Sequence, residues 1–166
     1  PQAFASLELD PQVFTLLVIG GSLGARKINE LVKTHLPLFQ EKRVQVLWQC
    51  GAYYYPEYRS YESDTVRVVP FVEDMKAAYS VADVIISRAG ASSVSELAVV
   101  GKPVIFVPSP NVAEDHQTKN AQAIADLKAA LLLKETAIVA DFAPMFASLL
   151  EDASLRQTLS QNFKQL

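Results

Sequence analysis

The sequence contains few of the residues that build disulfides and metal sites. Its 166 residues include one cysteine, Cys50, and two histidines. A single cysteine allows no internal disulfide and fits a reducing cytoplasm. With so few sulfur and imidazole ligands, a zinc site is not expected, and no other cofactor is expected either. Because Cys50 ends an apolar stretch, we expect it to be a buried structural thiol.

Long apolar runs and an excess of positive charge are also missing. No run approaches the roughly 20 residues of a membrane-spanning helix, and the N-terminus carries no signal-like segment. The formal net charge of -3 argues against a nucleic-acid partner and against a basic membrane patch. Half of the residues are apolar, so the chain is expected to form one globular domain over residues 1–166.

The sequence does contain a regular alternation of apolar and amphipathic segments. The expected strands are 14–19, 44–49, 66–72, 83–87, 103–108 and 130–134. The expected helices are 25–39, 54–61, 74–81, 93–100, 115–128, 142–151 and 154–164. Apolar strands separated by helices predict a parallel sheet covered on both faces. The connection rules then favour an α/β fold of the Rossmann-like, doubly wound kind, with ligands at the carboxyl ends of the strands.

A turn of small residues, 87–93, joins the fourth expected strand to a helix. Such a turn leaves N–H groups exposed at the start of the helix, and these groups with the helix dipole favour a phosphate. Glu96 follows about one turn into the helix, where a carboxylate can reach a sugar hydroxyl. The pattern therefore predicts a nucleotide or nucleotide-sugar site.

A second glycine-bearing turn, 20–25, follows the first expected strand. The two turns are expected to form two sides of one diphosphate cradle. The alternative is that both are ordinary tight turns in which glycine serves only the backbone geometry. The serines of these turns lack the context of a nucleophile elbow, which favours phosphate binding or capping over covalent catalysis.

The segment 115–120 places polar side chains in and around the first turn of a helix. Gln and Asn side chains both donate and accept hydrogen bonds, which suits sugar hydroxyls. The alternative is a solvated helix start with Asp115 as its N-cap. His116 taken alone is more typical of a surface or capping histidine than of a catalytic base.

Two nucleotide-binding classes fit the sequence poorly. A nicotinamide enzyme needs the G-x-G-x-x-G spacing and a carboxylate after the second strand, whereas this chain has Gly20, Gly21 and Gly24 and ends that strand at Gln49-Cys50. A P-loop nucleotidase needs Gly-Lys-Ser/Thr after the glycines, and none follows. A non-catalytic nucleotide-binding or interaction domain stays open.

Four segments resemble, in their order and spacing, the C-terminal domain of the MurG family. They are 20–26, 71–75, 87–96 and 116–121, and the resemblance runs over nearly the whole chain. That family makes lipid II from lipid I for peptidoglycan, using UDP-N-acetylglucosamine as the donor. It has the GT-B architecture, in which two Rossmann-like domains face each other across a cleft. The resemblance implies that residues 1–166 are the C-terminal UDP-sugar-binding domain of such a hexosyltransferase.

The resemblance also implies roles for individual residues. Phe71 and Val72 resemble the uracil pocket, with the Val72 backbone reading the base edge, and Glu96 resembles the carboxylate that binds the ribose. The implied ligands of the diphosphate are Gly21, Ser22, Gly24, Gly90, Ala91, Ser92 and Ser93. The implied polar contacts to the N-acetylglucosamine are His116, Gln117 and Asn120. The family more often has glutamine at the position of His116.

The resemblance implies an inverting, direct displacement by a 4-hydroxyl of the acceptor, with UDP as the leaving group. N–H dipoles aimed at the diphosphate would stabilise its developing charge without a metal. The family's base and its acceptor loops belong to an N-terminal domain, which this chain is expected to lack together with the family's final return helix. We therefore assign no catalytic residue here and expect donor binding without turnover. The full-length protein is expected at the cytoplasmic face of the bacterial inner membrane, with lipid I bound through the missing domain.

Other assignments remain open at this point. Another GT-B enzyme of UDP-sugars, such as a lipid glucosyltransferase or the UDP-N-acetylglucosamine epimerase, would share the fold and the nucleotide. Arg88 has three possible roles: it contacts the diphosphate, faces the missing domain, or pairs with an acid.

Overall fold

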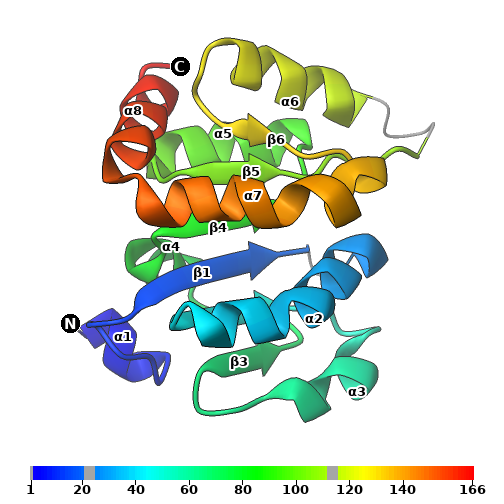
Figure 1. The fold of residues 1–166 in the computed structure, drawn as a ribbon, viewed down its shortest axis with the longest axis vertical. Coiled ribbons are helices and arrows are strands. Elements are labelled where there is room, and N and C mark those ends of the chain that lie inside the picture. The colour runs from blue at the N-terminus through cyan, green and yellow to red at the C-terminus, as the bar shows by residue number, and fades with distance from the viewer. Residues whose placement is uncertain (1, 21–24, 112–115) are drawn as a thin grey trace. The chain divides into compact units, whose positions relative to one another are not determined.

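The computed structural model describes residues 2–20, 25–111 and 116–166. Its strands form a six-stranded sheet in the order β3-β2-β1-β4-β5-β6 (Figure 1). This is the strand order of a Rossmann sheet, so the predicted α/β fold with a doubly wound parallel sheet is confirmed. The chain divides into two compact units, Pro1–Ile85 and Ile86–Leu166, and each is described here by itself.

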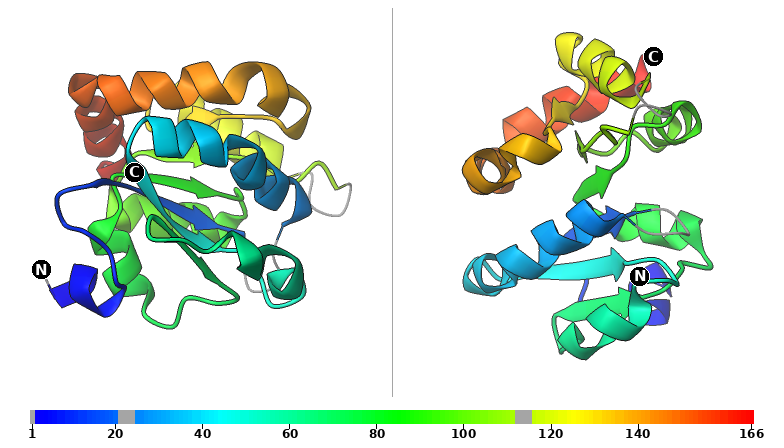
Figure 2. Two further views of the ribbon diagram at one scale, coloured as in Figure 1. Left: turned by 60° about the horizontal axis from the view of Figure 1, so that its bottom comes forward. Right: turned by 90° about the vertical axis from the view of Figure 1, so that its right-hand side faces the viewer.

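The N-terminal unit is built on three parallel strands with long pairing. β1 (Phe14–Ile19) pairs with β2 (Val44–Gln49) over its full length, and β2 pairs with β3 (Val66–Val69). The helices of this unit are α1 (Gln2–Ser6), α2 (Arg26–Glu41), α3 (Tyr55–Tyr58) with the 3-10 turn η1 (Arg59–Tyr61), and α4 (Met75–Val81). Figures 1 and 2 show α2 on one face of these strands and α4 on the other.

The core of this unit follows directly from the sequence pattern. Leu16, Leu17 and Val18 of β1 are fully buried on both faces of the strand, as expected for a covered parallel sheet. On α2 the buried side chains include Ile28 and Leu31, spaced to face one side of a helix.

The C-terminal unit takes up the end of β4 (Val84–Ser87) and continues through shorter strands. β5 (Val104–Phe106) pairs in parallel with β6 (Leu131–Leu132). The helices are α5 (Ala91–Val100), α6 (His116–Asp126), the 3-10 turn η3 (Glu135–Ala137), α7 (Ile138–Glu151) and α8 (Ala153–Lys164). Within this unit, α5 and α7 lie on opposite faces of the strands (Figures 1 and 2). Aromatic rings fill its core, with Phe106 edge-on to Phe163 at 6.0 Å.

Some element boundaries differ from those expected. β3 ends at Val69 instead of continuing to 72, because Pro70 has no N–H to donate to the sheet. α5 begins at Ala91 and α7 at Ile138, both earlier than expected. The short helix α1 was not predicted. No helix within the described ranges is both long and apolar enough to span a membrane.

Candidate functional site

The helix that follows the first glycine turn is held firmly to the end of β2. Asn29 of α2 is fully buried. Its Nδ2 donates to the Cys50 carbonyl at 3.0 Å, and its Oδ1 accepts from the Trp48 indole at 2.8 Å. Both halves of one amide therefore fix the start of α2 beside the carboxyl end of β2. Three predicted diphosphate ligands in the preceding turn lie outside the described residues: Gly21, Ser22 and Gly24.

Phe71 and Val72 follow the carboxyl end of β3, as expected for residues of a base pocket. Phe71 is 54% exposed, whereas Val72 is 4% exposed. The Val72 N–H donates to Oε1 of Gln49 at 2.8 Å. A hydrogen bond between the Val72 backbone and a base would therefore use the Val72 carbonyl, unless Gln49 is displaced from the N–H. Sequence analysis did not identify Gln49; its only signal is a polar residue that ends an apolar strand.

The start of α5 offers backbone N–H groups to a ligand. Gly90 is the N-cap, and a glycine has no side chain that could accept a hydrogen bond from the first N–H groups of the helix. The first bond of the helix runs from the Val94 N–H to the Gly90 carbonyl at 2.9 Å. The N–H groups of residues 91–93 come before that bond, and a helix leaves such groups without a partner of its own. Ala91 and Ser92 are exposed, so this end of α5 is suited to an anion.

The backbone conformation at position 90 does not require glycine. Its φ of -63° and ψ of 154° are open to any residue. Among the residues that the structure describes, a Cβ at this position would meet Nε2 of Gln117 alone, at an ordinary contact distance of 3.8 Å. Serine, aspartate or asparagine would also cap the helix better. The remaining advantage of glycine is that it lets a ligand come close to the backbone.

Glu96 is an exposed residue of α5. Because α5 starts at Ala91, the Glu96 Cα lies about 7.5 Å along the helix axis from that start. Side chains of a helix generally lean toward its N-terminus, so we expect the Glu96 carboxylate to extend toward the end of α5 that suits an anion.

Two residues predicted to contact the sugar, Gln117 and Asn120, hold the backbone of Ala89. Oε1 of Gln117 accepts from the Ala89 N–H at 3.2 Å and from the Ser109 N–H at 2.9 Å. Nδ2 of Asn120 donates to the Ala89 carbonyl at 3.0 Å. Since the Gln117 oxygen is shared by two N–H donors, any sugar contact of this residue falls to its amide nitrogen. His116 is exposed at the first turn of α6.

Arg88 pairs with an acid, which is one of the three roles left open by the sequence. Its Nη1 lies 2.6 Å from Oε2 of Glu135 and donates to the Val107 carbonyl at 3.1 Å. The Arg88 side chain is 20% exposed and that of Glu135 is 12% exposed. Nothing in the sequence pointed to Glu135, because this acid is far from Arg88 along the chain.

Two titratable groups of the N-terminal unit have perturbed pKa values. Burial raises the pKa of the Cys50 thiol to about 11, and burial with nearby carboxylates raises the pKa of Tyr58 to about 12. Cys50 is fully buried, as expected for a structural thiol, and it stays protonated at neutral pH. Across the described ranges, no group of three or more His, Cys, Asp or Glu side chains is placed to hold a metal ion.

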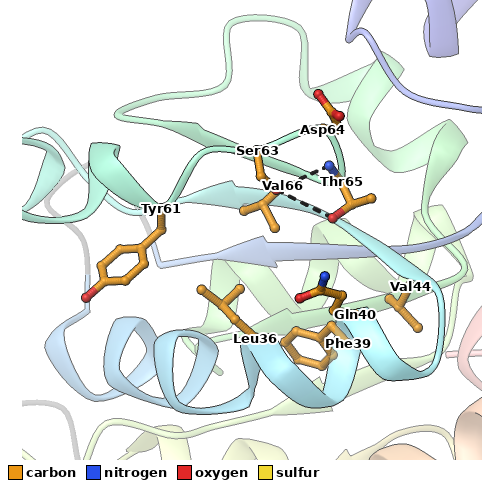
Figure 3. Close-up of a pocket in the computed structure, with 9 residues that line it drawn as sticks. All are labelled: Leu36, Phe39, Gln40, Val44, Tyr61, Ser63, Asp64, Thr65 and Val66. Carbon is orange, nitrogen blue, oxygen red and sulfur yellow. Dashed lines mark hydrogen bonds between the residues drawn. The ribbon is translucent and has the colours of Figure 1, made fainter.

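A cavity of about 450 Å³ lies elsewhere in the N-terminal unit (Figure 3). It is lined by the last turns of α2 and by Val44 and Val66, which begin β2 and β3. It therefore lies at the amino ends of these strands, whereas Phe71 and Val72 follow the carboxyl end of β3. We do not include this cavity in the candidate site.

Comparison with known proteins shows a family match and related sequences over nearly the whole chain. Residues 15–164 match the glycosyltransferase family 28 C-terminal domain. A protein of Flavobacterium psychrophilum is 49% identical over 166 residues, and one of Christiangramia forsetii is 51% identical over 165 residues. Both are named UDP-N-acetylglucosamine--N-acetylmuramyl-(pentapeptide) pyrophosphoryl-undecaprenol N-acetylglucosamine transferase. Each alignment covers 99% of this chain and 45% of the relative, so the chain spans less than half the length of these proteins.

Solved structures agree in fold. The crystal structure of Acinetobacter baumannii MurG superimposes with a TM-score of 0.80 at 32% identity, covering 98% of this chain and 48% of that one. A glycosyltransferase of kitacinnamycin superimposes with a TM-score of 0.72 at 20% identity, covering 92% of this chain and 39% of that one. The second match concerns the fold alone.

Proposed function

Because the chain belongs to the glycosyltransferase family 28 C-terminal domain family, we propose that it is the donor-binding half of a GT-B hexosyltransferase. The proposed donor is UDP-N-acetylglucosamine, and the proposed reaction converts lipid I to lipid II in peptidoglycan synthesis. The relatives of about 50% identity carry that activity in their names. Since they are about twice as long as this chain, the complete reaction is proposed for a protein of their length.

The observation that carries this proposal is the N-terminus of α5, which begins at a glycine N-cap, Gly90, whose backbone conformation does not require glycine. Backbone N–H groups at a helix start bind a phosphate, and the absence of a Cβ lets the phosphate reach them. We assign Gly90, Ala91, Ser92 and Ser93 to the diphosphate on this basis. Gly21, Ser22 and Gly24 keep their predicted role as further diphosphate ligands.

The nucleoside is assigned to three groups: a carboxylate, an aromatic ring and a backbone carbonyl. Glu96 is exposed on α5, and side chains of a helix generally lean toward its N-terminus, which supports its role as the ribose ligand. Phe71 is exposed enough to stack on a uracil ring. The Val72 carbonyl is proposed to accept a hydrogen bond from the base, because its N–H is already bonded to Gln49.

The sugar is assigned to the first turns of α6. His116 is exposed there, and the Gln117 amide nitrogen lies 3.8 Å from the point where a Gly90 Cβ would stand. Both are therefore proposed to contact the N-acetylglucosamine, as is Asn120. For Gln117 and Asn120 these contacts come in addition to their bonds with the backbone of Ala89.

The proposed mechanism is a direct displacement at the anomeric carbon. The acceptor oxygen forms a bond to that carbon, the bond to the UDP β-phosphate oxygen breaks, and a base takes the acceptor proton. The N–H groups of α5 are fixed by folding, so they stabilise the charge on the departing diphosphate without reorganisation. We place the base and the lipid I site in a second domain, and the full-length protein at the cytoplasmic face of the inner membrane.

Calorimetric titration of this chain with UDP tests the proposal, with UMP and NAD as comparison ligands. We expect saturable UDP binding that is weaker for UMP and lost in Glu96→Ala. Glu151→Ala is the matched control, since it removes an exposed carboxylate from another helix of the same unit. Absence of UDP binding at millimolar concentration, or preference for NAD, would contradict the proposal.

Competition among donors tests the sugar specificity. UDP-N-acetylglucosamine is expected to displace UDP more effectively than UDP-glucose or UDP-galactose do. Equal displacement by all three would instead favour another GT-B enzyme of UDP-sugars.

A further inference from the structure

The turn between β4 and α5 is held by hydrogen bonds from the protein's own side chains. The Ala89 N–H is held by Gln117, and the Ala89 carbonyl is held by Asn120. Ser87 Oγ donates to the Arg88 carbonyl at 2.8 Å. The backbone that leads into Gly90 is therefore held by hydrogen bonds on both sides of Ala89.

The Arg88 side chain adds an anchor of a different kind. It reaches back to the Val107 carbonyl, next to the end of β5, and to Glu135 in η3. Both charged side chains are mostly buried, so solvent and salt screen their attraction less than that of a surface pair. Removing one partner of such a pair leaves the other charge uncompensated, which costs more than the loss of a surface ion pair.

We propose that Glu135 is a positioning residue for diphosphate binding, because through Arg88 it holds the turn that aims the N-terminus of α5. The inference rests on the proposed function of that helix end as the diphosphate seat. Preorganisation of this kind raises affinity because the entropy of ordering the turn is lost on folding and not on binding. Arg88 in this arrangement is an anchor of the turn, and the diphosphate is met by backbone N–H groups.

The opposite role for Arg88 makes an opposite prediction. If Arg88 turned away from Glu135 to bind the diphosphate directly, neutralising Glu135 would release the guanidinium and strengthen UDP binding. If Glu135 positions the turn, the same change weakens UDP binding. The sign of the effect of Glu135→Gln therefore separates the two roles.

The test compares UDP with uridine in nuclear magnetic resonance titrations of the chain and of Glu135→Gln. We expect the variant to bind UDP roughly tenfold more weakly, equivalent to about 1.4 kcal/mol, while its affinity for uridine is unchanged. A purely structural defect would lower the affinity for both ligands together. Unchanged or tighter UDP binding, or an equal loss for both ligands, overturns the inference.

Two further variants serve as controls for the effect of Glu135→Gln on UDP affinity. Glu151→Gln, which changes an exposed acid of the same unit, is expected to leave both affinities unchanged. The charge exchange Arg88→Glu with Glu135→Arg rebuilds an ion pair in reverse and is expected to recover most of the lost UDP affinity. No recovery beyond that of Glu135→Gln alone counts against positioning through the pair.

Amide hydrogen exchange of the unliganded protein tests the inference even if UDP does not bind, in which case the proposed function itself fails. The amides of residues 88–91 are expected to exchange faster in Glu135→Gln than in the parent chain, while those of α7 and α8 are not. If Glu135→Gln does not fold, the same comparison is made with Glu135→Asp, which keeps the charge and shortens its reach. Unchanged exchange in the turn overturns the inference.

Discussion

The substitution Gly90→Ala separates the needs of the fold from the needs of a ligand. Within the described part of the chain, the added methyl group meets the Gln117 amide nitrogen alone, at 3.8 Å, and the φ of -63° suits alanine. Replacing glycine by alanine at a compatible position stabilises a protein by about 0.4–1 kcal/mol through the unfolded chain. Alanine is a poorer N-cap than glycine by a similar amount. We therefore expect the free energy of unfolding to change by less than about 1 kcal/mol.

The effect of Gly90→Ala on binding is expected to be much larger. The methyl group would stand where the diphosphate approaches the N–H groups of α5, and it would keep the phosphate from at least one of them. A hydrogen bond to a charged group contributes about 1.5–3 kcal/mol, so the UDP dissociation constant is expected to rise roughly tenfold to a hundredfold. Urea unfolding measures the first quantity and calorimetric titration with UDP measures the second.

Val99→Ala is the control for Gly90→Ala, because Val99 is a highly exposed residue nearer the other end of α5. It is expected to change neither quantity appreciably. A folded Gly90→Ala protein with unchanged UDP affinity would refute the assignment of the α5 N-terminus to the diphosphate. A loss of several kcal/mol in stability would refute the argument that the fold does not need this glycine.

Two more predictions concern the end of β2. Asn29→Leu leaves the Trp48 indole N–H and the Cys50 carbonyl without their partner in the core. The free energy of unfolding, measured in urea, should therefore fall by roughly 2–6 kcal/mol. A fall of less than about 1 kcal/mol would contradict the role given to the Asn29 amide. The pKa of Cys50 is raised on folding from 9.0 to about 11, so the protonated thiol stabilises the fold fully below about pH 9, and this contribution is lost as the pH rises through about 11. The free energy of unfolding should therefore fall more steeply over that range in the parent chain than in Cys50→Ala, and equal slopes would show that the thiol is not buried as described.

The sequence by itself determined the order of strands, turns and helices, and where the turns predicted to bind a ligand lie within that order. The apolar run of β1 predicted its bounds, Phe14–Ile19, because a strand covered on both faces needs apolar residues throughout. The turn before α5 was identified in the same way, since small residues between a strand and a helix are a local feature. The helix boundaries depended on more than the local pattern. A helix that began at residue 142 would have Pro144 in its first turn, where proline is tolerated. The observed helix α7 nevertheless starts earlier, at Ile138.

Only the tertiary structure decided what the polar side chains do. Gln117 and Asn120 had a pattern that suits sugar hydroxyls, but their amides hold the backbone of Ala89, which is far from them along the chain. Gln49 takes the Val72 N–H, and Glu135 takes Arg88, for the same reason. A side chain's hydrogen-bond partner is chosen by which backbone and charged groups folding brings within about 3 Å. Local patterns place a residue on an element, and only packing brings it to its partner.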